Sequence, residues 1–147
     1  MRFESHGWVA EVDVDATRRA YAAGGPGASV ECGCTECGNF IEARDAGYVY
    51  PAEVADLLLD MGVDPNRESE IYAAGPVDHG SIRYGGWFNI AGQLVEDRRE
   101  STDIEPGFAL YPMPEGALVD PAFGQAPVFR IEFEVIVPWM ASRARKR

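Results

Sequence analysis

The segment from Val128 to Val137 constrains the fold most, because apolar and charged residues alternate along most of it. The side chains at every second position are apolar: Phe129, Ile131, Phe133, Val135 and Val137. The positions between them include Arg130, Glu132 and Glu134. A period of two is typical of a β-strand with one face buried and the other in water. We therefore predict a strand here that contributes one face to the core.

Similar patterns predict further strands at 8–15, 28–34, 70–74, 81–94 and 108–113. Apolar residues recur at helical spacing after Pro51, and Gly62 and Pro65 end that pattern. A shorter helix is expected at 39–44. These elements predict an α+β fold, a mostly antiparallel β-sheet with one or two helices packed on it. Its core should include Leu57, Leu58, Phe129, Ile131 and Phe133.

At 147 residues the chain is expected to form one domain, 1–140, followed by a basic tail, 141–147. Two long loops are expected, at 96–107 and 112–127. The beginning of the chain lacks a secretory signal, and no run approaches the ~20 apolar residues that span a bilayer. We therefore expect a cytoplasmic protein with no membrane partner.

The formal net charge of −11 argues against nucleic acid as a partner, since that binding depends on Lys and Arg. Such a charge is compatible with a basic protein partner. It also has a simpler explanation, because acidic surfaces keep proteins soluble. The sequence leaves both explanations open.

All three cysteines lie close together, at Cys32, Cys34 and Cys37. Cys34, Cys37 and the glycine that follows match the turn with which zinc ribbons hold a metal. A flat strand would place the sulfurs of Cys32 and Cys34 roughly 7 Å apart, so a shared metal would require Gly33 to bend the chain. Four interpretations stay open: reduced cysteines in a buried turn, a structural zinc site, thiol redox chemistry and a nucleophilic cysteine beside a histidine.

His79 follows Asp78 in an expected turn, where it could supply a fourth metal ligand or an acid–base group. A solvated turn histidine is the alternative. The sequence contains no serine-hydrolase elbow, HExxH motif, P-loop or GxGxxG fingerprint. Enzymatic activity is therefore not the favoured interpretation.

Two glycines interrupt the expected strand at 81–94 just before Trp87, which indicates a bulge or a close backbone approach. Trp87 would share the outer face of this strand with Arg83 and Asn89. An aromatic side chain beside Arg and Asn can anchor a binding partner. Alternatively, Trp87 packs beneath a neighbouring loop.

Three motifs together resemble a group of proteins from GC-rich bacteria that has no assigned activity. They are Cys32-x-Cys34-x-x-Cys37-x-Asn39-Phe40, the helix end Met61-Gly-Val-Asp-Pro65, and Tyr84-Gly-Gly-Trp-Phe88. The resemblance covers 30–90 and, more loosely, the final strand to Trp139. It implies a soluble, free-standing bacterial domain and assigns no site residues.

Two functional hypotheses follow. The first is a small non-enzymatic domain that recognises a basic or amphipathic partner through Arg83, Trp87 and Asn89, as toxin-neutralising immunity proteins do by analogy. The second is a metal-binding or thiol-dependent protein that uses Cys32, Cys34 and Cys37, with His79 as a further ligand and zinc as the cofactor.

Overall fold

The computed structural model describes residues 1–78 and 80–140, and both His79 and the basic tail at 141–147 lie outside the described residues. The strands are β1 (Arg2–Ser5), β2 (Trp8–Val12), β3 (Glu70–Asp78), β4 (Ser81–Asp97), β5 (Asp103–Glu105), β6 (Phe108–Met113) and β7 (Val128–Pro138). The helices are α1 (Val14–Ala23), α2 (Ala28–Cys32), α3 (Thr35–Asp45), α4 (Ala52–Asp60) and the short 3₁₀ helix η1 (Pro121–Phe123).

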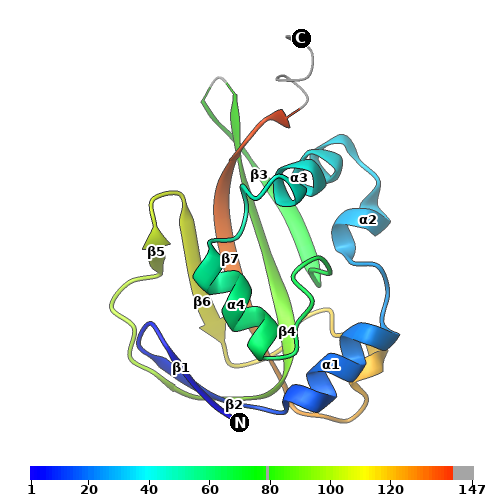
Figure 1. Ribbon diagram of the computed structural model, residues 1–147, viewed down its shortest axis with the longest axis vertical. Helices are drawn as coiled ribbons and strands as arrows, with labels where there is room; N and C mark the ends of the chain where they lie inside the picture. Colours follow the sequence, from blue (N-terminus) through cyan, green and yellow to red (C-terminus); the bar gives the residue numbers. More distant parts are fainter. Residues whose placement is uncertain (79, 141–147) are drawn as a thin grey trace.

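The strands form one seven-stranded sheet in the order β1-β2-β4-β7-β6-β5, with β3 paired to β4. Every strand pair in the described residues is antiparallel. The long strand β4 pairs with β3 along its first half and with β2 along its second half (Figure 1). Helices packed on this sheet confirm the predicted α+β class.

β4 and β7 form the centre of the sheet, and their inward side chains form the middle of the core. Phe88 pairs with Ile131 and Tyr84 with Val135 across the two strands. The five apolar residues of alternate positions in β7 are all buried, so the predicted phase of this strand is confirmed: Phe129, Ile131, Phe133, Val135 and Val137. Burial of that face stabilises the fold through the hydrophobic effect.

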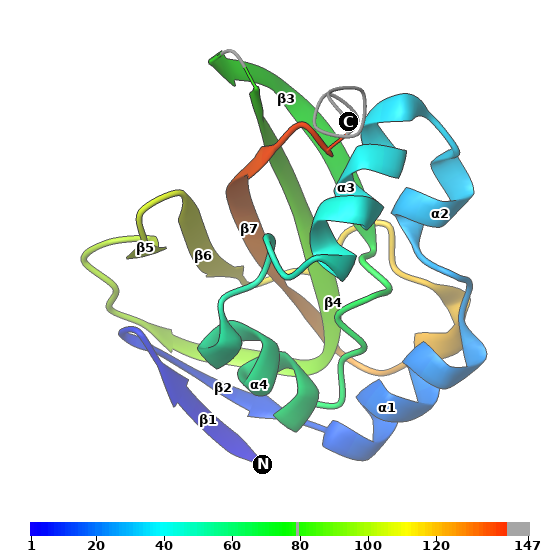
Figure 2. The same cartoon turned by 45° about the horizontal axis from the view of Figure 1, so that its top comes forward.

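The helices cover this same face of the sheet, as Figures 1 and 2 show from two directions. α4 follows the predicted pattern, with Val54 and Leu58 buried and Leu57 partly buried against the core, and Met61 is buried directly after the helix. Gly62 has a φ of +91°, and a Cβ there would lie 2.6 Å from the Val14 carbonyl oxygen of α1. Glycine therefore ends α4 and permits its close approach to α1.

Three local predictions differ from the structure. The expected strand at 28–34 is the helix α2, which ends where Gly33 adopts a φ of +67°. The expected strand at 8–15 ends at Val12 because the Asp13 side chain accepts a hydrogen bond from the Ala16 amide and begins α1. The described residues thus contain two α-helices and one 3₁₀ helix more than the sequence indicated, and β5 lies within the expected loop at 96–107.

The two glycines before Trp87 are explained by close approaches on both faces of β4. The Tyr72 ring of β3 lies across Gly85, where a Cβ would collide with it. A Cβ at Gly86 would collide with the carbonyl oxygen of Glu70. Within the described residues, no helix has the length and apolar character needed to cross a membrane.

Candidate functional site

The three cysteines converge at the junction of α2 and α3. Cys32 is the last residue of α2, Cys34 caps the N-terminus of α3, and Cys37 lies in the first turn of α3. Their three Sγ atoms all lie within 4.8 Å of one another. The left-handed conformation of Gly33 reverses the chain between the first two cysteines, which brings together sulfurs that a flat strand would separate.

The cluster combines two accessible thiols with one buried thiol. Cys32 and Cys34 are exposed and Cys37 is buried, and none of the three forms a disulfide. The Sγ atoms of Cys32 and Cys34 are 3.0 Å apart. The Cys37 amide donates a hydrogen bond to the Cys34 Sγ over 3.4 Å. A backbone N–H aimed at a sulfur favours its thiolate form.

The local electrostatics separate Cys34 from Cys37. Hydrogen bonds from the Cys32 thiol and from the Cys37 amide lower the pKa of Cys34. Burial raises the pKa of Cys37, and the neighbouring sulfurs raise it further. Cys34 therefore ionises more readily than Cys37.

The start of α3 is held firmly against the sheet. The Tyr84 hydroxyl donates to the Glu36 carbonyl oxygen over 2.6 Å, and the Asn39 amide donates to the Tyr84 hydroxyl over 3.2 Å. Asn39 also accepts a hydrogen bond from the Met140 amide at 2.6 Å. These contacts fix the turn that carries Cys34 and Cys37, which is the support that a preorganised site needs.

The described residues contribute three potential ligands to this cluster and no fourth. No carboxylate or imidazole of the described chain joins the three sulfurs within the same distance. The suggested ligand His79 lies outside the described residues. A metal held by the cysteines alone would therefore have one tetrahedral position left for an outside ligand.

The predicted binding residues on β4 have different environments. Arg83 is about half-exposed and lies 4.0 Å from a Glu134 carboxylate oxygen. Asn89 is fully buried, and its side chain exchanges two hydrogen bonds with the backbone of Ala117. It is therefore inaccessible to a partner in this conformation, and we remove it from the proposed binding surface.

Trp87 is only partly exposed because the loop between β6 and β7 contacts its edge. Its indole N–H donates to the Ala117 carbonyl oxygen over 3.0 Å. The Arg130 guanidinium lies over its ring, 5.6 Å from the centroid. Trp87 therefore packs beneath a loop, which is the alternative that the sequence left open.

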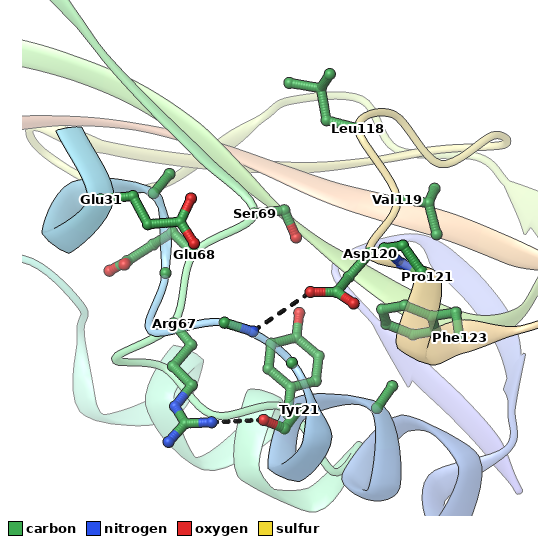
Figure 3. A pocket seen from close by; sticks show the side chains of 15 residues that line it. Tyr21, Glu31, Arg67, Glu68, Ser69, Leu118, Val119, Asp120, Pro121 and Phe123 are labelled. Atoms are coloured by element: carbon green, nitrogen blue, oxygen red, sulfur yellow. Dashed lines mark hydrogen bonds between the residues drawn. The ribbon is translucent and has the colours of Figure 1, made fainter.

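A second site candidate was missed by the sequence analysis: a cavity between α1, α2 and the segment 118–123 (Figure 3). Its polar groups come from distant parts of the chain, including Tyr21, Glu31 and Asp120. No motif spacing links these positions. The double glycine at 24–25 was the one local signal, and the sequence alone indicated only a loop there.

Comparison of the chain with protein families, with curated proteins and with solved structures gave no match. The resemblance to a bacterial group drawn from the cysteine and 84–88 motifs stays a prediction.

Proposed function

We propose that the protein binds one thiophilic metal ion, with zinc as the first candidate, through Cys32, Cys34 and Cys37. The observation that carries this proposal is the convergence of the three sulfurs within 4.8 Å. Thiolates are the soft ligands that Zn²⁺ and Cu⁺ prefer. Tetrahedral zinc with Zn–S bonds of ~2.3 Å requires sulfurs roughly 3.8 Å apart, so small side-chain rotations would complete the ligand set.

An ion bound here would be accessible from solvent. Cys32 and Cys34 are exposed, while the buried Cys37 anchors the site to the protein. Closed structural zinc sites use four protein ligands, whereas sites with three keep one position for water or a substrate. With the three ligands that the described residues supply, the proposed site belongs to the open class, in which the ion can exchange or act on a small ligand.

The hypothesis of a partner-binding domain has less structural support at its proposed surface. Asn89 is buried and Trp87 donates its indole N–H to the loop at Ala117. Recognition of a basic protein partner stays a prediction that rests on the net charge. A cytoplasmic location also stays a prediction.

Thiol–disulfide exchange is the second candidate function. It is favoured by the 3.0 Å separation of the Cys32 and Cys34 sulfurs and by the exposure of both. In that reaction two thiols lose two protons and two electrons to a disulfide substrate, which is reduced to two thiols. A bound metal would block this exchange, so the two functions can be tested together.

The experiment is an anaerobic titration of the reduced protein with Co²⁺, followed by displacement with Zn²⁺. We expect one equivalent of Co²⁺ to produce the absorption of thiolate-to-metal charge transfer, and one equivalent of Zn²⁺ to remove it. Cys34→Ser and Cys37→Ser should each abolish this absorption. Glu36→Gln, which lies between these cysteines and leaves all three sulfurs, is the matched control and should retain it.

Two results would contradict metal binding. One is a spectrum without charge-transfer absorption at one equivalent of Co²⁺. The other is a spectrum of Cys34→Ser and Cys37→Ser that equals the spectrum of wild type. If the metal-free protein then reduces a small disulfide at a rate that Cys34→Ser abolishes, the second candidate function replaces the first.

A further inference from the structure

The cavity of Figure 3 lies on the α1 side of α2 and has its own polar lining. Its volume is about 370 Å³, within the ~300–1,000 Å³ of typical small-molecule sites. Tyr21 forms part of its wall, and its ring meets Phe123 edge-on at a centroid distance of 6.1 Å. The Tyr21 hydroxyl donates to the Asn89 carbonyl oxygen over 2.8 Å, which fixes this wall to β4.

Two carboxylates, from Glu31 and Asp120, reach the cavity from different elements. Asp120 accepts hydrogen bonds from the amides of Ala122 at 2.8 Å and of Gly25 at 3.4 Å. In the described part of the chain, neither carboxylate forms an ion pair. No cation among the described residues therefore neutralises the negative charge of Glu31 and Asp120.

The other charged residues of the lining are directed elsewhere. Arg67 donates to the Tyr21 carbonyl oxygen over 2.6 Å, and its side chain bends away from the two carboxylates (Figure 3). Glu68 is buried and accepts two hydrogen bonds from Arg44, at 2.7 and 2.8 Å. Arg44 therefore compensates Glu68, and the charge that faces the cavity is that of Glu31 and Asp120.

The adjacent glycines Gly24 and Gly25 leave space for these carboxylates. A Cβ at Gly24 would lie 2.9 Å from Asp120 Oδ2, and one at Gly25 would lie 2.7 Å from Glu31 Oε1. The φ of Gly24 is −79°, which any residue can adopt, so its backbone does not require glycine. The missing side chains instead allow the carboxylates to lie against the loop.

The rim adds exposed apolar surface. Leu118 is 68% exposed and Val119 is 40% exposed, and both line the cavity opposite α2. Leu118 also has a φ of +50°, an uncommon conformation for a residue with a side chain. An apolar surface beside two carboxylates fits a ligand that has a positive group on an apolar stem.

We propose that this cavity binds a small organic cation. Its ammonium or guanidinium group would lie between Glu31 and Asp120, and its alkyl stem would contact Leu118 and Val119. A free amine and the side chain of an arginine share this chemistry. The site is separate from the cysteine cluster, so the proposal does not depend on metal binding.

Isothermal titration calorimetry with defined probes tests the proposal. Agmatine and cadaverine represent free amines, and N-acetyl-arginine amide represents an arginine side chain. We expect saturable binding of at least one probe, weakened roughly tenfold by the loss of each carboxylate in Glu31→Gln and Asp120→Asn. Asn at 120 keeps the acceptor for the Ala122 amide, so the turn should survive. Asp56→Asn on the exposed surface of α4 changes the net charge equally and should bind like wild type.

The ranking of the probes identifies the source of the cation. Tighter binding of agmatine or cadaverine supports a free amine, and tighter binding of N-acetyl-arginine amide supports a peptide side chain. Gly25→Ala is a second variant, expected to weaken binding by displacing the Glu31 carboxylate. The proposal is overturned if no probe binds below about 10 mM, if the double carboxylate variant binds as tightly as wild type, or if neutral pentylurea binds as well as agmatine.

Discussion

Replacement of Trp87 by alanine should destabilise the protein by about 3–4.5 kcal/mol. The indole hydrogen bond to Ala117 contributes about 1 kcal/mol, and the Arg130 guanidinium over the ring contributes about 0.5–1 kcal/mol. A buried aromatic residue truncated to alanine costs about 3–5 kcal/mol, and a partly exposed one about half of that. The sum is a large fraction of the ~5–15 kcal/mol that stabilises a typical domain.

Urea denaturation of matched variants separates these contributions. Trp87→Phe keeps a ring beneath Arg130 and removes the N–H, so it should lose about 1–2 kcal/mol. Arg83→Ala, at a half-exposed position on the same face, should change the free energy of unfolding by less than about 0.5 kcal/mol. A loss below about 1 kcal/mol in Trp87→Ala would refute this reasoning. It would mean that the loop does not hold the indole, and it would restore Trp87 as an anchor for a partner.

Two further predictions concern the core and its buried charge. Phe133 is fully buried against four aromatic rings, so Phe133→Ala should cost about 3–5 kcal/mol in urea denaturation, whereas Leu59→Ala at an exposed position of α4 should cost less than about 0.5 kcal/mol. Similar losses of stability in Phe133→Ala and Leu59→Ala would contradict the packing of Phe133 in the core. Burial raises the pKa of Glu68 above its ordinary 4.5, with Arg44 offsetting part of the shift, so the folded protein takes up this proton at higher pH than the unfolded chain. The stability of wild type relative to Glu68→Gln should therefore increase as the pH falls from the folded-state pKa towards 4.5. A difference in free energy of unfolding that does not change with pH would contradict the raised pKa of Glu68.

The sequence predicted the elements whose patterns are longest. β7 and α4 follow apolar periods over many residues, and those periods persist because one face of each element is buried. The segment 28–34 was assigned wrongly because its pattern is too short to distinguish a strand from a helix. Its helical form depends on tertiary contacts, including the Ala28 amide, which donates to the Glu68 carbonyl oxygen.

The candidate sites were predictable to different extents. The cysteines could be found by their spacing, but the convergence of their sulfurs depends on α2 and on the left-handed conformation of Gly33. The cavity between α1, α2 and the segment 118–123 could not be found from the sequence, because Gly25 and Asp120 are 95 residues apart in the chain and meet only in the fold. Burial of Asn89 likewise follows from the position of the loop at Ala117, which no local pattern encodes.

X-ray absorption spectroscopy at the zinc edge tests the central claim most directly. The sample is the reduced protein loaded with one equivalent of zinc and passed through a desalting column. Binding by Cys32, Cys34 and Cys37 predicts three sulfur neighbours at ~2.3 Å and one lighter neighbour at ~2.0–2.2 Å. Loss of the zinc on the column, or a first shell made mainly of nitrogen and oxygen, would contradict the proposed thiolate site.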